Sequence, residues 1–347
     1  MDDRSPKRLW RYGGLSEPAS IRLLAWLLRY PSRYVPRILL YHHFGEDPRF
    51  VSPSGFERHL RFLKGHCNVI HLTQLIAALR GTGRMPPNSV VLTVDDGYVD
   101  FYRVAFPLLC RYEMPCTFFV TTNFVEGRTW LWPDKLAWIL AHAKRFPNLR
   151  VADKMVTGGG RQAWPRLWAE ILTPLRQMDA HQIQYELDAV AKQLALECPD
   201  RPSGLYEACN WQQLREMEDS GLVEIGGHTR NHPILSRLNP AKLPEEIDGC
   251  LEDLNTRLGH RPRSFCYPNG QPTDYNALTR DAVARSGFLC ACTAFYDDNH
   301  LTDHYALRRF TSSEDFSQFF KAASALQYWG ASILGRNNID ATELVSP

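Results

Sequence analysis

Short apolar runs alternate with amphipathic stretches along most of the chain, and this alternation predicts strands that are each followed by a helix. The run Ser89–Val94 is almost continuously apolar, which is typical of a parallel strand covered on both faces. Six further strands are predicted at 37–42, 68–71, 116–120, 223–226, 264–267 and 288–293. Helices are predicted at 56–63, 72–80, 100–112, 211–220, 243–258, 277–285 and 316–326. Such alternation indicates a parallel α/β sheet or barrel.

The start of the first of these helices carries its own signal. Ser54 is followed three residues later by Glu57, the spacing of a capping box, which predicts that the helix begins directly afterwards.

The alternation breaks between residues 126 and 207. This segment contains five tryptophans and reads as several helices separated by three consecutive glycines at 158–160, so we predict an all-helical insertion. The resulting division is an N-terminal helical segment (1–35), a first part of the α/β fold (36–125), the insertion (126–207), a second part of the α/β fold (208–312), and a C-terminal helix and tail (313–347).

Composition and charge exclude several classes of protein. With 44% hydrophobic and 22% charged residues, the chain is neither disordered nor fibrous. A net charge of +2 gives no basic field for nucleic acid, so no nucleic-acid partner is expected. No stretch reaches the roughly 18 apolar residues of a membrane span, although the arginine-bearing segment 21–30 leaves peripheral membrane contact open. The oligomeric state is not predicted.

Two features favour a cytoplasmic location. The first residues, Met-Asp-Asp-Arg, lack the basic-then-apolar order of a secretory signal. The nine cysteines are odd in number and show no Cys-x-x-Cys spacing, which fits small buried side chains in a reducing compartment.

Residues with metal-binding chemistry follow two of the predicted strands. Asp95 and Asp96 come directly after 89–94, where two carboxylates are costly to bury unless they are paired or bind a metal. His228 and His232 follow 223–226, and at i and i+4 two imidazoles meet on one face of a helical turn. Taken singly, the motifs also fit a plain turn and two unrelated surface histidines. Together, one Asp and two His form a three-ligand site with open positions, as in catalytic metal centres.

These motifs resemble those of a known family. The segment 93–97 (Thr-Val-Asp-Asp-Gly) resembles the first motif of the NodB-homology polysaccharide deacetylases, carbohydrate esterase family 4, and 228–232 (His-Thr-Arg-Asn-His) resembles the second. The segment 265–270 (Phe-Cys-Tyr-Pro-Asn-Gly) resembles the third motif in its Tyr-Pro-x-Gly form, and 39–42 resembles the opening strand of one branch. The resemblance covers about 36–125 and 210–310 and implies a distorted (β/α)₇ barrel.

The resemblance also implies roles for individual residues. Asp95 is then the general base, and Asp96, His228 and His232 are the ligands of a divalent metal, most often Zn²⁺ in this family. Such a metal polarises the acetyl carbonyl and lowers the pKa of the attacking water. The backbone N–H of Asn269 takes the place of the oxyanion donor.

The chain departs from the family pattern in the residues around the base and in the proton donor. Cys266 stands where the commoner third motif has an arginine that orients the base, and we expect Arg308 or Arg309 to substitute for it, the alternative being a solvated surface pair. The family's late Leu-x-His triplet, which carries the general acid, is missing from the matching region, where only His300 and His304 occur.

The sequence thus predicts a metal-dependent hydrolase that removes acetyl groups from an N-acetylated, or less readily an O-acetylated, sugar or polysaccharide precursor. With a cytoplasmic location, that precursor is expected to be lipid- or nucleotide-linked. Two alternatives stay open: another hydrolase of non-peptide C–N bonds on the same fold, and a non-catalytic carbohydrate-binding relative. The insertion is expected to be either a lid or docking surface for the substrate, or a purely structural or self-associating appendage.

Overall fold

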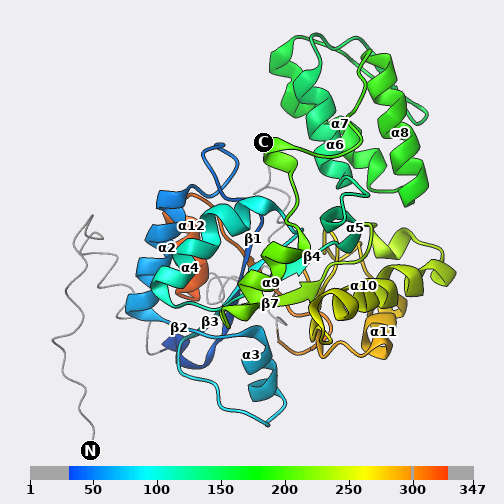
Figure 1. The fold of residues 1–347 in the computed structure, drawn as a ribbon. Coiled ribbons are helices and arrows are strands. Elements are labelled where there is room, and N and C mark those ends of the chain that lie inside the picture. The colour runs from blue at the N-terminus through cyan, green and yellow to red at the C-terminus, as the bar shows by residue number, and fades with distance from the viewer. Residues whose placement is uncertain (1–30, 298–300, 327–347) are drawn as a thin grey trace, which may run out of the picture.

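The structure is a computed structural model that describes residues 31–297 and 301–326 (Figure 1). Several predictions lie outside the described residues: those for most of the N-terminal segment, including 21–30, for His300, and for the tail after residue 326.

A parallel sheet forms the centre of the molecule, in the order β10-β1-β3-β4-β7-β8-β9, with β2 beside β3. These strands are β1 (Arg37–Tyr41), β2 (Asn68–Val69), β3 (Ser89–Val94), β4 (Cys116–Val120), β7 (Val223–Gly227), β8 (Ser264–Cys266), β9 (Cys290–Cys292) and β10 (Phe310–Thr311). A bridge between Cys292 and Leu307 places the segment before β10 beside β9, while β10 itself pairs with β1. The two edges of the sheet therefore approach each other, and the predicted distorted α/β barrel is confirmed.

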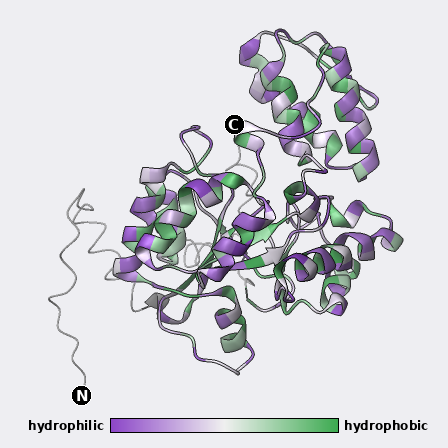
Figure 2. Ribbon diagram, viewed as in Figure 1, coloured by the Kyte–Doolittle hydropathy of each residue, from purple (hydrophilic) through white to green (hydrophobic). Residues whose placement is uncertain are grey.

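Helices cover the outside of this barrel (Figure 1). They are α2 (Pro53–His66), α3 (Leu72–Leu79), α4 (Phe106–Tyr112), α5 (Thr122–Val125), α9 (Trp211–Asp219), α10 (Leu243–Leu258), α11 (Ala277–Ser286) and α12 (Phe316–Ala323), with a π-helical turn at Phe101–Ala105. Short 3₁₀ turns lie at Pro31–Tyr34, Arg161–Ala163, Gly204–Tyr206, Leu235–Arg237 and Pro240–Lys242. Hydrophilic and hydrophobic residues alternate around these helices, as expected for amphipathic elements (Figure 2).

The first helix starts earlier than the sequence predicts. The side chain of Ser52, rather than Ser54, accepts the capping hydrogen bond, from the N–H of Gly55 at 2.9 Å. Pro53 then occupies the first helical position, where a missing N–H has no cost.

The insertion differs from the all-helical prediction. It contains α6 (Trp132–His142), α7 (Trp164–Leu175) and α8 (Ala180–Gln193), but also an antiparallel hairpin of β5 (Leu149–Val151) and β6 (Lys154–Val156). The hairpin strands have only three residues each, too few to show a period of two in the sequence. The insertion has its own apolar core and stands apart from the barrel helices in Figure 1.

Every residue of β3 is buried: Val90, Leu92 and Val94 lie in an apolar cluster with the helices α2 and α12, and Val91 lies in a second cluster with residues of β1, β4, β8 and β9. Since all pairings among the barrel strands are parallel, their carboxyl ends meet at one end of the barrel, where residues 95–97 and 228–232 follow β3 and β7. Among the described residues, no helix is both long and apolar enough to cross a lipid bilayer.

Candidate metal centre

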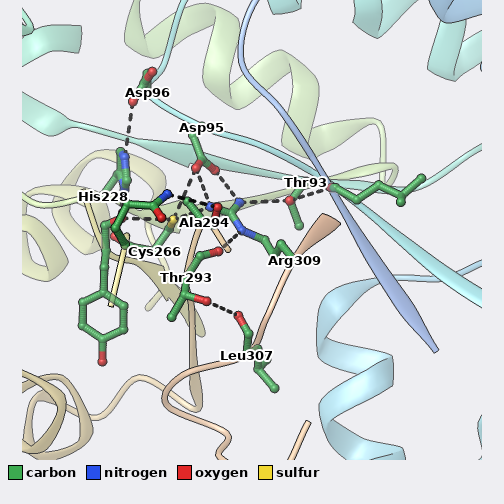
Figure 3. Close-up of polar contacts among 12 residues, drawn as sticks. Thr93, Asp95, Asp96, His228, Cys266, Thr293, Ala294, Leu307 and Arg309 are labelled. Atoms are coloured by element: carbon green, nitrogen blue, oxygen red, sulfur yellow. Dashed lines mark hydrogen bonds and ion pairs between the residues drawn. The ribbon is translucent and has the colours of Figure 1, made fainter. Parts of the chain in front are cut away.

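The buried side chains of Asp96, His228 and His232 converge at the carboxyl ends of β3 and β7. Figure 3 shows the contact between Asp96 and His228. Asp96 Oδ1 lies 3.3 Å from His228 Nε2 and 3.2 Å from His232 Nε2. Two atoms bound tetrahedrally to one zinc ion at about 2.0–2.2 Å are themselves about 3.4 Å apart. The measured separations are close to that value, so this donor set fits a small divalent cation.

The orientation of His228 also suits a metal ligand. Its Nδ1 lies 2.7 Å from the carbonyl oxygen of Cys266, where an Nδ1–H donates to the carbonyl and leaves the Nε2 lone pair facing Asp96. Burial alone raises the pKa of Asp96, but its hydrogen bonds with His228 and His232 hold that pKa well below the usual value.

The loop that carries the two histidines is not the helical turn expected from their spacing. Thr229 and His232 have φ values of +66° and +58°, in the left-handed region, so the chain folds back tightly after β7. The His232 N–H donates to Thr229 Oγ1 at 2.9 Å. Glu246, on α10, accepts from the backbone N–H groups of Arg230 at 3.1 Å and Asn231 at 2.9 Å. These bonds fix the loop and bring His232 to Asp96.

Asp95 is held by a fully buried arginine. Arg309 donates from Nη1 to Oδ1 at 2.7 Å and from Nη2 to Oδ2 at 2.6 Å, and its side chain is 0% exposed (Figure 3). Its Nε donates to the carbonyl oxygen of Thr293 at 2.5 Å. Burial favours the neutral acid, but the charge and hydrogen bonds of Arg309 outweigh it and lower the pKa of Asp95 below its usual value. Asp95 is therefore an anion at neutral pH.

Of the two candidate arginines, only Arg309 reaches Asp95. Arg308 instead donates from Nε to Asp297 at 3.0 Å and from Nη1 to Tyr275 at 2.8 Å. The position taken by an arginine in the commoner third motif is filled by the smaller Cys266, whose Sγ lies 3.0 Å from Arg309 Nη2 and 3.4 Å from Asp95 Oδ2.

A second group of possible ligands overlaps the first. Asp95, His228 and Cys266 also lie close enough together to share an ion. Both oxygens of Asp95 are engaged by Arg309, and His228 Nδ1 is engaged by a carbonyl. The group with Asp96 and the two Nε2 atoms is therefore the better metal site.

Asn269 follows β8 and has a left-handed backbone with φ of +57°. Among the described residues, none accepts a hydrogen bond from its backbone N–H, and its buried side-chain nitrogen also has no partner. The N–H is thus available to a ligand.

Comparison with known proteins identifies the family of this chain. The model of the family described as "Polysaccharide deacetylase" matches residues 82–291, which is more than half of the chain. The chain belongs to the polysaccharide deacetylase family. The Bacillus subtilis protein YxkH is 30% identical over 122 residues, 34% of this chain and 43% of that protein. The poly-beta-1,6-N-acetyl-D-glucosamine N-deacetylase of Staphylococcus aureus is 32% identical over 75 residues, 22% of this chain and 26% of that protein. These matches span less than half of either relative.

Solved structures share the fold at low sequence identity. The Streptococcus pyogenes deacetylase PplD in complex with acetate superposes with a TM-score of 0.55 at 19% identity, covering 84% of this chain and 96% of that one. IcaB from Ammonifex degensii gives 0.56 at 21% identity, covering 83% and 97%. The deacetylase fold therefore extends over most of the described chain.

Several polar residues lie near this deacetylase-type centre, and two of them, His42 and His43, are those that the sequence places at the mouth of the site at the end of the first predicted strand. His42 follows β1 directly; burial lowers its pKa, although the charges of Asp96 and Asp95 act to raise it. His43 Nδ1 lies 2.7 Å from Asp100 Oδ2. By contrast, His304 is tied to β9 by its carbonyl oxygen, and no described contact joins its ring to Asp95 or Asp96. The sequence signal for these residues is the Tyr-His pair that ends the first predicted strand, 37–42.

Proposed function

We propose that this chain is a metal-dependent deacetylase that hydrolyses the acetamido group of an N-acetylated sugar. The observation that carries the proposal is the convergence of Asp96, His228 and His232 beside the ionised carboxylate of Asp95. Membership of the polysaccharide deacetylase family supports the reaction, and the name of the Staphylococcus aureus relative points to N-acetylglucosamine units as the substrate class.

Asp96, His228 and His232 would hold the metal, and their two imidazole nitrogens and one carboxylate oxygen favour Zn²⁺. When bound, the ion polarises the acetyl carbonyl and lowers the pKa of water. With only three protein ligands, the site leaves room for water and substrate.

Asp95 accepts the proton of the attacking water. Each of its oxygens has two acceptor directions. Oδ2 accepts from Arg309 and from the Cys266 thiol, whereas Oδ1 accepts from Arg309 alone and keeps one direction free. Arg309 keeps the Asp95 carboxylate ionised and oriented before the substrate binds. The Asn269 N–H donates to the oxygen on which negative charge develops.

His42 is our assignment for the group that protonates the leaving sugar amine. It follows β1 directly and interacts electrostatically with both Asp95 and Asp96, while burial lowers its pKa and makes the protonated ring a stronger acid. No Leu-x-His histidine is needed in this arrangement.

The test is metal content together with acetate release from N-acetylglucosamine oligomers of several lengths and from an O-acetylated sugar. The wild-type protein should bind about one zinc ion per chain, lose activity to a chelator and regain it with Zn²⁺. Asp96→Asn should lose both metal and turnover, whereas Asp153→Asn, at an exposed position in the insertion, should change neither. Full turnover by a metal-free Asp96→Asn protein would overturn the proposal.

A further inference from the structure

The insertion contributes a carboxylate next to the proposed metal centre. Asp134 lies in the first turn of α6, and its Oδ2 accepts from the hydroxyl of Tyr98 at 2.7 Å. Tyr98 is only two residues after Asp96 in the chain. One hydrogen bond therefore joins the insertion to the turn that carries a proposed metal ligand.

The ring of Tyr98 belongs to a packed aromatic wall. The ring of His43 lies between those of Tyr98, at 3.7 Å, and Phe50, at 4.2 Å between centroids. Asp100 fixes the His43 ring through Nδ1. Because His43 lies two residues after the end of β1 and each ring is held by a neighbour, this wall is a rigid surface beside the centre.

Asp134 has acceptor capacity that the protein does not use. Among the described residues, none donates to its Oδ1 and none forms an ion pair with it. Burial raises the pKa of Asp134 to about 7; His43 and the Tyr98 hydrogen bond oppose this shift, and the nearby charge of Asp96 adds to it. A partly buried acid that forms no ion pair is costly for the fold, and such groups cluster at functional sites.

The surroundings of Asp134 suit a sugar ring. Tyr206 and Arg49 both interact electrostatically with Asp134, and the partly exposed ring of Trp130 lies 6.0 Å from that of Tyr206. Aromatic rings offer a flat apolar face, and carboxylate and guanidinium groups pair with hydroxyls. Such a combination would bind a polyhydroxylated ring and would offer little to a small apolar acyl compound.

We infer that Asp134 is a substrate-positioning residue, whose Oδ1 accepts a hydrogen bond from a hydroxyl of the sugar at the metal centre. The insertion then forms one wall of the sugar site and is part of the specificity of the enzyme. This inference rests on the proposed function, because it takes an acetylated sugar as the substrate.

The experiment compares two substrates of the zinc-loaded full chain: an N-acetylglucosamine oligomer and 4-nitrophenyl acetate, which has no hydroxyl. The readout is the ratio of kcat/KM for the sugar to kcat/KM for the ester. Asp134→Ala should lower this ratio about 10-fold, mainly through KM for the sugar, the size expected for losing one hydrogen bond to a carboxylate. Glu170→Gln, which removes an exposed carboxylate on α7, should leave the ratio unchanged.

A purely structural role is separated by the partner residue. If Asp134 acts only by holding Tyr98, then Tyr98→Phe alone should reproduce the effect, and adding Asp134→Ala should change nothing further. We expect the double variant Tyr98→Phe/Asp134→Ala to have a ratio about 10-fold below that of Tyr98→Phe alone. In the Tyr98→Phe background the hydrogen bond to Oδ2 is already absent, so the further loss reports on Oδ1. If the alanine variant does not fold, Asp134→Asn is compared in the same way and should lower the ratio in the same direction.

The outcomes separate the two proposals. A wild-type protein that cleaves the ester but no acetylated sugar overturns the proposed function. A wild-type protein that cleaves the sugar, with an unchanged ratio in folded Asp134 variants, overturns only the role of Asp134. An equal loss on both substrates would also overturn it, because that is the result of a general disturbance of the centre.

Discussion

Replacing Arg309 by methionine should raise the pKa of Asp95, so that its carboxylate becomes protonated at a higher pH than in the wild-type protein. Arg309 is fully buried and donates two charge-assisted hydrogen bonds to Asp95, at 2.7 and 2.6 Å. Methionine keeps the apolar stem and removes the charge. The negative charge of Asp95 is then buried without a cationic partner that hydrogen-bonds to it, and the Cys266 thiol remains as a weak donor to Oδ2.

The magnitude follows from the cost of a buried charge without its partner. Removing one member of a buried ion pair typically costs about 3–5 kcal/mol. Losing the arginine therefore raises the pKa of Asp95, because the buried carboxylate loses the charge and the two hydrogen bonds that favour its ionised form. In the wild-type protein this pKa lies below its usual 3.8, so the pair stabilises the fold above about pH 4 and this stabilisation is lost as the pH falls further.

The assay is the pH dependence of kcat/KM for acetate release, together with urea unfolding across the same range. The acidic limb of Arg309→Met should move to higher pH, and its deficit in unfolding free energy should shrink as the pH falls and Asp95 becomes protonated in both proteins. Arg308→Met is the matched control, since Arg308 contacts Asp297 and Tyr275 instead. A folded Arg309→Met protein whose acidic limb coincides with that of the wild type would refute the reasoning.

Three further predictions concern the base, the ligand loop and the core. Asp95→Asn should keep its metal and lose about 10²-fold or more in kcat, whereas loss of metal would show that the roles of Asp95 and Asp96 are exchanged. Glu246→Gln should release metal about 10-fold faster in a chelator competition, because Glu246 holds two N–H groups of the ligand loop; unchanged release would contradict this. Burial lowers the pKa of His59 from 6.5 to about 3, so the unfolded state binds the proton more readily and stability falls by up to about 1.4 kcal/mol per pH unit from pH 6.5 downward. His59→Phe should flatten this slope in unfolding experiments, whereas exposed His181→Gln should leave it as in the wild type.

The barrel strands could be predicted because burial on both faces leaves a direct trace in the sequence. All six residues of β3 are buried, and the apolar run that predicted this strand has the same bounds, Ser89–Val94. Parallel strands then place the residues that follow them at one end of the barrel, so Asp96 and His228 were expected to meet although 132 positions separate them. Short elements lacked such a trace: β5, β6 and β10 have two or three residues each.

The shape of the ligand loop could not be predicted, because distant groups determine it. Two histidines at i and i+4 suit a helical turn, but Thr229 and His232 adopt left-handed conformations that the sequence does not favour. Glu246 compensates this by accepting hydrogen bonds from the loop, and it lies on the following helix. The choice between Arg308 and Arg309 was hidden for a similar reason, since neighbouring residues of an extended segment point to opposite sides and only the register decides which faces the core.

The register that directs Arg309 into the core also links the closure of the barrel to the pKa of Asp95. Arg309 donates its backbone N–H to the carbonyl of Phe295 and its side-chain Nε to the carbonyl of Thr293, two residues that follow β9, while its guanidinium holds Asp95 after β3. At the position on β8 where the commoner third motif has its arginine, this chain has Cys266. The smaller cysteine side chain leaves room for the guanidinium of Arg309, which comes from the segment before β10. Asp95 needs a buried cation that binds both of its oxygens, and that cation can come from a strand other than β8. In this chain Arg309 directly precedes β10, which pairs with β1, so a change that loosens this pairing should raise the pKa of Asp95 without altering Asp95 or Asp96 themselves.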